Sequence, residues 1–309
     1  MKLSGVIVPH VTPLTAEERL DHAGLGRLIE FLLRSGVHGL FVNGSMGGFA
    51  LLTDAVQLEV TEASIALVRR RVPVLAGVAE TGTARARAKL RQVARLKPNA
   101  VVALCPYYYL CRQDELERFF LTIADASPCP IVLYDNPKLA KNTLAPETIA
   151  RLAVHPNIIG AKISAPDAAK WAEVLRKDLP RDRFALICGA EHMMSTGLRL
   201  GFDGVTGGLH NLVPGTAAAM IEAARAGDFD EADRLQLTLN RLLRVFEIDG
   251  GWRGAELALS SLGICRKITA SPHDLPMPEE KRAEILQILV REGVLPTFQP
   301  EPSIPSHDA

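Results

Sequence analysis

The order of its segments is the feature that most limits how this chain can fold. Short β-rich runs alternate with longer amphipathic segments eight times before residue 214. The β-rich runs are residues 5–8, 39–42, 73–78, 100–104, 130–134, 157–162, 184–188 and 203–206. Such alternation requires parallel strands, and eight units close a cylinder, so the pattern predicts an α/β fold, the (β/α)8 TIM barrel. An open doubly wound sheet is the alternative, but it usually has fewer strands, and its GxGxxG turn after the first strand is absent.

The amphipathic segments predict the helices and the limits of the barrel. Asp21 can cap the first helix. The second starts near Thr53 or Asp54, with an inward face of Val56, Val60, Ala63 and Leu67. From Pro214 onward the pattern contains helices only. We therefore predict a barrel over residues 1–213, a C-terminal helical region over 214–295 and a disordered, proline-rich tail over 296–309.

Composition favours a small-molecule partner. The 35 basic residues balance the 35 acidic ones without a long run of either sign, so we expect neither nucleic acid nor a membrane as partner. Five cysteines, an odd number without ligand spacing, indicate free thiols in a reducing compartment. The N-terminal segment lacks a signal-peptide core, and no apolar stretch is long enough to span a bilayer. We expect a cytoplasmic protein.

A lysine stands at the end of one of the β-rich runs. Residues 157–164 read NIIGAKIS, and Lys162 follows the apolar part of this run. A strand of this composition is normally buried on both faces in a parallel sheet, and burial favours the neutral, nucleophilic amine. The alternative is a lysine at a strand end whose side chain extends to water.

Tyrosines and a glycine-rich loop also lie at strand ends. The chain has four tyrosines: Tyr107, Tyr108 and Tyr109 follow the fourth run, and Tyr134 ends the fifth, next to the strand of Lys162. A phenol beside a buried amine can carry protons in carbonyl chemistry. After the second run, GSMGG offers the Ser45 hydroxyl and backbone N–H groups that could bind a carboxylate. The alternatives are interface aromatics for the tyrosine triple and a tight turn for the loop.

As an ordered set, these motifs resemble the dihydrodipicolinate synthase / N-acetylneuraminate lyase family. The matching stretches are GVIVPHVTPLT, FVNGSMGGFALLT, PYYY, YDNP, GAKIS, CGAEHMM and GFDGVTGG. The resemblance covers residues 1 to about 295. It implies a class I, Schiff-base mechanism on pyruvate or another 2-keto acid, without metal or other cofactor, in a homotetramer built as a dimer of dimers.

Site residues follow from this resemblance by motif. Lys162 matches the imine-forming lysine, Tyr134 the proton-transferring tyrosine and Ser45 the first hydroxyl of the glycine-rich loop. Tyr108 matches a tyrosine that a neighbouring subunit lends to the proton relay. Substrate binding is assigned to Ser45, Met46, Ser164, Gly189, Glu191, His192, Thr206 and Gly208. For Glu191 and His192, a polar first helical turn is the alternative role.

Departures from the family pattern bear on the substrate. Met46 replaces the second hydroxyl of the loop, and Gly48 replaces a glutamate. Leu139 stands where the dihydrodipicolinate branch has an arginine for the carboxylate of its aldehyde substrate. The resemblance therefore favours the aldolases and dehydratases of 2-keto-3-deoxy sugar acids.

We predict an enzyme, a carbon–carbon (or carbon–oxygen) lyase of the class I aldolase type. It acts on pyruvate or a 2-keto-3-deoxy sugar acid by reversible cleavage of a carbon–carbon bond, with a 2-keto acid and an aldehyde as its partners. The alternatives are dihydrodipicolinate synthase, a sugar-acid dehydratase and a non-catalytic ligand-binding protein. A metal-dependent aldolase is disfavoured, because no His/Asp/Glu set has metal-ligand spacing.

Overall fold

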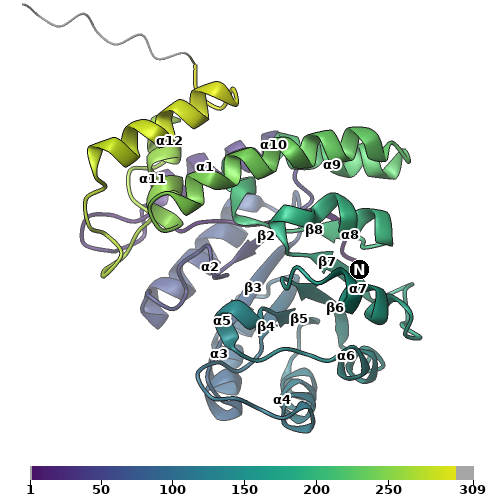
Figure 1. Cartoon of the computed structure of the whole chain (residues 1–309). Coiled ribbons are helices and arrows are strands. Elements are labelled where there is room, and N and C mark those ends of the chain that lie inside the picture. Colours follow the sequence, from purple (N-terminus) through teal and green to yellow (C-terminus); the bar gives the residue numbers. More distant parts are fainter. Residues whose placement is uncertain (1, 297–309) are drawn as a thin grey trace, which may run out of the picture.

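The computed structural model describes residues 2–296. Eight parallel strands form a closed barrel in chain order, with β1 paired to both β2 and β8 (Figure 1). They are β1 (Gly5–Pro9), β2 (Gly39–Val42), β3 (Val74–Val78), β4 (Ala100–Leu104), β5 (Ile131–Asp135), β6 (Ile158–Ile163), β7 (Ala185–Cys188) and β8 (Gly204–Val205). Every strand residue is buried. The predicted TIM barrel is confirmed, and the tail predicted for 296–309 lies outside the described residues apart from Pro296.

Helices follow the strands and cover the barrel. They are α1 (His22–Arg34), α2 (Asp54–Val68), α3 (Thr83–Arg95), α4 (Gln113–Ala126), α5 (Pro137–Ala140), α6 (Pro146–Ala153), α7 (Ala168–Leu175), α8 (Met194–Leu200) and α9 (Pro214–Arg225), with short 3-10 turns at η1 (Glu191–Met193) and η2 (Gly208–Asn211). The predicted caps are present. Asp21 accepts a hydrogen bond from the Gly24 N–H, and Thr53 accepts one from the Val56 N–H.

The inward face of α2 differs from the prediction. Val60 is buried as expected, but Val56, Ala63 and Leu67 are only partly buried. The buried positions of this helix also include the polar residues Gln57, Thr61 and Ser64. The reason is that each of these side chains has a buried polar partner: the Gln57 amide donates to loop carbonyls, the Thr61 hydroxyl accepts from Asn43, and the Ser64 hydroxyl lies 3.2 Å from the His10 Nε2. The buried face of α2 is therefore partly polar.

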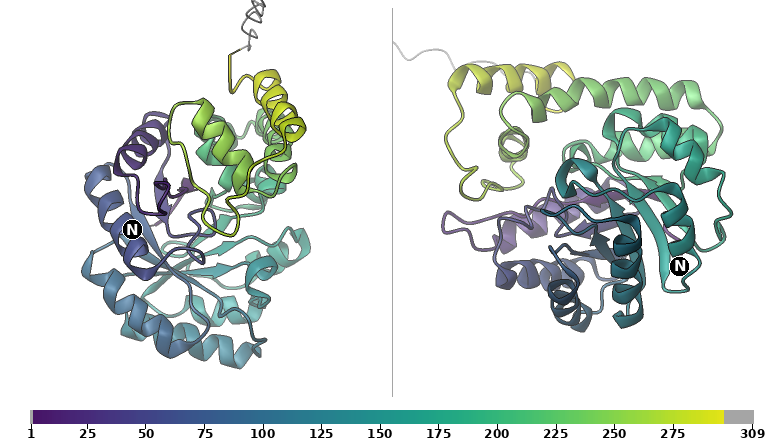
Figure 2. Two further views of the ribbon diagram at one scale, coloured as in Figure 1. Left: turned by 90° about the vertical axis from the view of Figure 1, so that its left-hand side faces the viewer. Right: turned by 60° about the horizontal axis from the view of Figure 1, so that its bottom comes forward.

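The remaining helices gather on one side of the barrel. These are α10 (Phe229–Glu247), α11 (Trp252–Ser261) and α12 (Glu279–Arg291) (Figures 1 and 2). Helix α10 packs along α9 and also contacts α8, α11 and α12. Helix α9 itself contacts β1 and α8, as the helix that follows the eighth strand. The boundary at residues 213 and 214 stays a prediction, since α9 belongs to both packing layers.

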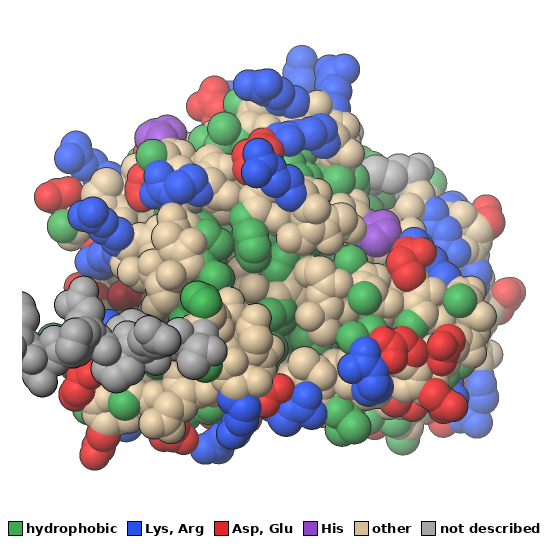
Figure 3. Space-filling view, turned by 90° about the horizontal axis from the view of Figure 1, so that it is seen from above, with side chains coloured by type: hydrophobic (Ala, Val, Ile, Leu, Met, Phe, Trp, Pro, Cys, Tyr) green, Lys and Arg blue, Asp and Glu red, His purple; other side chains and the backbone are tan. Residues whose placement is uncertain are grey.

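The surface and the cysteines match the composition. Acidic and basic side chains are interspersed around the face seen in Figure 3, and its middle is mostly uncharged. All five cysteines are free thiols. Within residues 2–296, no helix has the length and apolar character needed to cross a membrane.

Candidate active site

Lys162 and Tyr134 meet at the centre of the barrel. The register of β5 on β6 places them directly opposite each other. The Lys162 Nζ lies 4.1 Å from the centroid of the Tyr134 ring and 5.0 Å from that of Phe41. Both the lysine and the tyrosine are buried, with 6% and 4% of their surface exposed. The amine is thus enclosed by aromatic faces within reach of a phenol, as a nucleophile and a proton carrier for carbonyl chemistry require.

Two side chains hold the phenol of Tyr134. Its Oη lies 3.3 Å from the Ser45 Oγ, and it accepts a hydrogen bond of 2.9 Å from the Asn136 Nδ2. Burial alone raises the pKa of this phenol. The Lys162 ammonium and the hydrogen bonds to Ser45 and Asn136 lower it by more, so the pKa of Tyr134 is below its ordinary value. A phenol in this setting gives up its proton more readily than an exposed tyrosine.

The glycine-rich loop after β2 closes one side of the site. The Thr12 hydroxyl donates to the Gly47 carbonyl over 2.8 Å. Met46 packs over Gly208, where a Cβ would lie only 2.6 Å from the Met46 Sδ. The Met46 side chain therefore fits here because Gly208 has no side chain.

The assigned substrate-binding residues surround a single cavity of about 790 Å³. Its lining includes Lys162 and Tyr134 together with Ser45, Met46, Ser164, Gly189, Glu191, His192, Thr206 and Gly208. Tyr108 does not line it. Of the three consecutive tyrosines only Tyr107 does, with its ring edge against Phe49 at a centroid distance of 6.2 Å. The structure brings the other assigned residues together around this cavity, while Tyr108, which is assigned to the relay of a neighbouring subunit, lies outside it.

Polar groups of the cavity differ in how they are satisfied. The Glu191 Oε1 accepts a hydrogen bond of 2.9 Å from the Leu209 N–H, so this carboxylate joins η1 to η2. Burial raises the pKa of Glu191, and the backbone hydrogen bonds from η2 offset part of that rise. The Thr206 Oγ1 is buried and has no partner among residues 2–296. His192 is exposed at the mouth. Thr206 therefore adds to the cavity lining a buried hydroxyl that makes no hydrogen bond within the described residues.

Comparison with known proteins gives a consistent result. Residues 2–292 match the model of the dihydrodipicolinate synthetase family. A 4-hydroxy-tetrahydrodipicolinate synthase of Methanoculleus marisnigri is 33% identical over 294 residues, which are 94% of this chain and 99% of that protein. The chain belongs to the dihydrodipicolinate synthetase family. It is therefore an enzyme, a lyase of the class I aldolase type.

Other members of the family resemble the chain over nearly its whole length. A probable 2-dehydro-3-deoxy-D-pentonate aldolase of Escherichia coli is 29% identical over 300 residues, covering 96% of this chain and 99% of that protein. The crystal structure of YagE from Escherichia coli K12, a family member in complex with pyruvate, superposes with a TM-score of 0.88. It is 27% identical and covers 95% of this chain and 99% of that one.

Tyr108, the middle one of the three tyrosines after β4, lies at the surface. Tyr108 is 68% exposed and has a φ of 85°, which is costly for a residue with a side chain. Its ring packs edge-on against Tyr109 at 4.9 Å between centroids. Its assignment to a proton relay in a neighbouring subunit stays a prediction.

Asn136 and part of the cavity wall were not predicted from the sequence. A signal for Asn136 exists: residues two apart on a strand point to the same face, and Asn136 is two residues after Tyr134 at the strand end. The outer wall includes Leu243, Gly250, Gly251 and Trp252 from the C-terminal helical region. No local pattern indicates that this distant segment reaches the barrel mouth.

Proposed function

We propose that Lys162 forms an imine with a 2-keto acid and that the enzyme cleaves 2-keto-3-deoxy sugar acids to pyruvate and an aldehyde. The observation that carries the proposal is the buried Lys162 Nζ, 4.1 Å from the Tyr134 ring in a cavity of about 790 Å³. The volume leaves room beyond a keto acid for a longer chain.

The chemistry follows from these positions. The neutral amine of Lys162 adds to C2 of the keto acid. Loss of water, to which the Tyr134 phenol gives its proton, leaves a protonated imine beside an ionised phenol. The ionised phenol of Tyr134 then takes the proton of the C4 hydroxyl as the C3–C4 bond breaks. The bond's electron pair moves to the imine and leaves an enamine, while the aldehyde departs. Protonation at C3 and hydrolysis release pyruvate and restore the amine.

Other residues of the cavity would bind the substrate. The backbone N–H groups of Ser45 and Met46, with the Ser45 hydroxyl, would hold the carboxylate. Thr206, Ser164, Glu191 and His192 offer polar groups for the sugar hydroxyls. Leu139 lines the mouth, half exposed, and cannot pair a second carboxylate. This favours a polyhydroxy aldehyde over aspartate semialdehyde.

We extend the proposal to the assembly and its setting. Exposed, strained Tyr108 suits a residue that acts in a neighbouring subunit, and we propose a homotetramer arranged as a dimer of dimers. The free thiols support a cytoplasmic location.

Covalent trapping tests the imine. Pyruvate with borohydride should add a stable mass to Lys162, and Lys162→Met should abolish it. The exposed Lys138 serves as an internal control that stays unlabelled. Mass spectrometry that finds no adduct, or finds it on another residue, would sink the Schiff-base assignment.

A substrate comparison tests the aldehyde. The names of several relatives favour 4-hydroxy-tetrahydrodipicolinate synthase as a second candidate, which condenses pyruvate with the semialdehyde. We expect sugar-acid cleavage and little condensation. Efficient condensation without sugar-acid cleavage would reverse this choice and leave Lys162 in its role. Formation of a dehydrated keto acid without an aldehyde product would indicate the dehydratase.

A further inference from the structure

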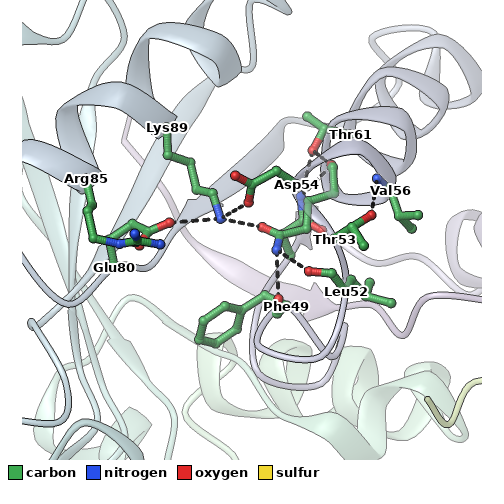
Figure 4. Close-up of polar contacts among 11 residues, drawn as sticks. Phe49, Leu52, Thr53, Asp54, Val56, Thr61, Glu80, Arg85 and Lys89 are labelled. Atoms are coloured by element: carbon green, nitrogen blue, oxygen red, sulfur yellow. Dashed lines mark hydrogen bonds and ion pairs between the residues drawn. The ribbon is translucent and has the colours of Figure 1, made fainter. Parts of the chain in front are cut away.

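A second polar cluster lies near the glycine-rich loop (Figure 4), and none of its charged residues lines the cavity. Its centre is Lys89 on α3, only 8% exposed. The Lys89 Nζ lies 3.1 Å from the Glu80 Oε1 and 3.0 Å from the Asp54 Oδ1. It also donates to the Gln57 Oε1 over 2.9 Å. Arg85 binds the other oxygen of Glu80 at 2.8 Å, so the two cations and two carboxylates of this cluster balance.

Lys89 determines which way the amide of Gln57 points. An ammonium can only donate hydrogen bonds, so the amide oxygen must face it and the amide nitrogen must face away. That nitrogen donates to two backbone carbonyls of the loop, Phe49 at 2.7 Å and Leu52 at 3.0 Å. Since Gln57 is buried, a reversed amide would set its oxygen against two carbonyl oxygens.

The bonded carbonyls belong to the loop that forms one wall of the cavity. The loop runs from Asn43 to Leu52 and carries Ser45, whose hydroxyl contacts the Tyr134 phenol. Phe49 lines the cavity and packs against Tyr107. Contacts at the start and middle of the loop come from Asn43 to α2 and from Thr12 to Gly47. Gln57 therefore fixes the last part of the loop, which these other contacts do not reach.

We propose that Lys89 and Gln57 are positioning residues that hold this loop in the shape that binds the carboxylate of the keto acid. The binding role of the loop rests on the proposed function. Neither residue lines the cavity, so each acts through the backbone at Phe49 and Leu52. A charge on α3 thereby acts, through a side chain of α2, on the loop that precedes α2.

Lys89→Met tests the proposal, with Arg87→Met as the matched control. Both variants remove one cation from α3, but Arg87 is exposed. Hydrogen exchange of a peptide covering residues 45–52 should become faster in Lys89→Met and stay unchanged in Arg87→Met. The pyruvate concentration that half-saturates borohydride trapping should rise about 10-fold or more in Lys89→Met, with full labelling at saturation, because a displacement of ~1 Å in a positioned group can cost ~10²-fold.

Gln57→Glu separates positioning from folding. It keeps an oxygen for Lys89 and replaces the two donated protons with a carboxylate oxygen. Its effects should match those of Lys89→Met, and the double variant should add little. If Lys89→Met fails to fold, Gln57→Glu carries the test alone. Wild-type exchange of residues 45–52 and wild-type pyruvate dependence in the folded variants would overturn the proposal. If pyruvate labels no variant, including the unaltered protein, the proposed function fails, while the exchange comparison still decides whether the loop is held.

Discussion

Asn136 offers a direct way to test the proposed role of Tyr134 as the proton carrier. Its Nδ2 donates to the Tyr134 Oη over 2.9 Å, and its side chain is 8% exposed. Asn136→Leu keeps the size and removes the donor. Asn136→Asp keeps the shape but places a carboxylate against the phenol. The backbone carbonyl of residue 136 still accepts the Ala140 N–H that starts α5, so local structure should persist in both variants.

The size of the effect follows from the hydrogen bond that is lost. A hydrogen bond to a charged group contributes about 1.5–3 kcal/mol, and each 1.36 kcal/mol changes a rate about tenfold. Asn136→Leu should therefore lower kcat by roughly 10- to 150-fold if the bond acts on the ionised phenol. Asn136→Asp should lower it further, because a neighbouring carboxylate disfavours the phenolate.

A pH profile distinguishes this role from a structural one. Hydrogen bonding from Asn136 lowers the pKa of Tyr134, so its loss should move the limb of the kcat profile that reports phenol ionisation to higher pH. The shift should be larger for Asn136→Asp. In a Tyr134→Phe background, Asn136→Leu should have no further effect on kcat. An unchanged pH limb, or a full additional loss in that background, would refute the reasoning.

Three more outcomes are expected. Tyr134→Phe should retain most pyruvate trapping but lose turnover by ~10²- to 10⁴-fold, and near wild-type turnover would remove this phenol from the mechanism. Gly189→Ala should slow trapping about tenfold or more without unfolding the barrel, since a Cβ there would lie 2.3 Å from the Ser164 Oγ and 3.3 Å from the Lys162 Cε; an unchanged trapping rate would contradict this packing. Burial lowers the pKa of His210 to about 3 from 6.5. Between these pH values the histidine is protonated in the unfolded chain but not in the folded one. The free energy of unfolding should therefore fall as pH falls, by about 1.4 kcal/mol per pH unit. His210→Leu should flatten this part of a denaturant-monitored stability profile, and an equal slope in both proteins would show that the histidine is not the cause.

The barrel and the pairing of Lys162 with Tyr134 could be predicted because both depend on chain order. Buried parallel strands read as short apolar runs, and successive strands are neighbours, so residues that end the fifth and sixth strands must lie close together. Gln57 could not be found in this way. The apolar positions of α2 suggested another inward face, and only the carbonyls of a loop explain why a buried amide is preferred there. The same holds for the bond between Glu191 and Leu209, which joins two loops with no shared pattern.

The outer wall formed by Leu243 and residues 250–252 has a consequence for how such enzymes can be recombined. A chimaera that joins this barrel to the C-terminal helices of a relative would have the relative's residues in this outer wall, while the residues on the barrel strands would stay the same. Its imine chemistry would be retained while its choice of aldehyde shifted toward that of the donor. Because the barrel loops and these helices line the same cavity, directed evolution of substrate range should diversify both segments in one library.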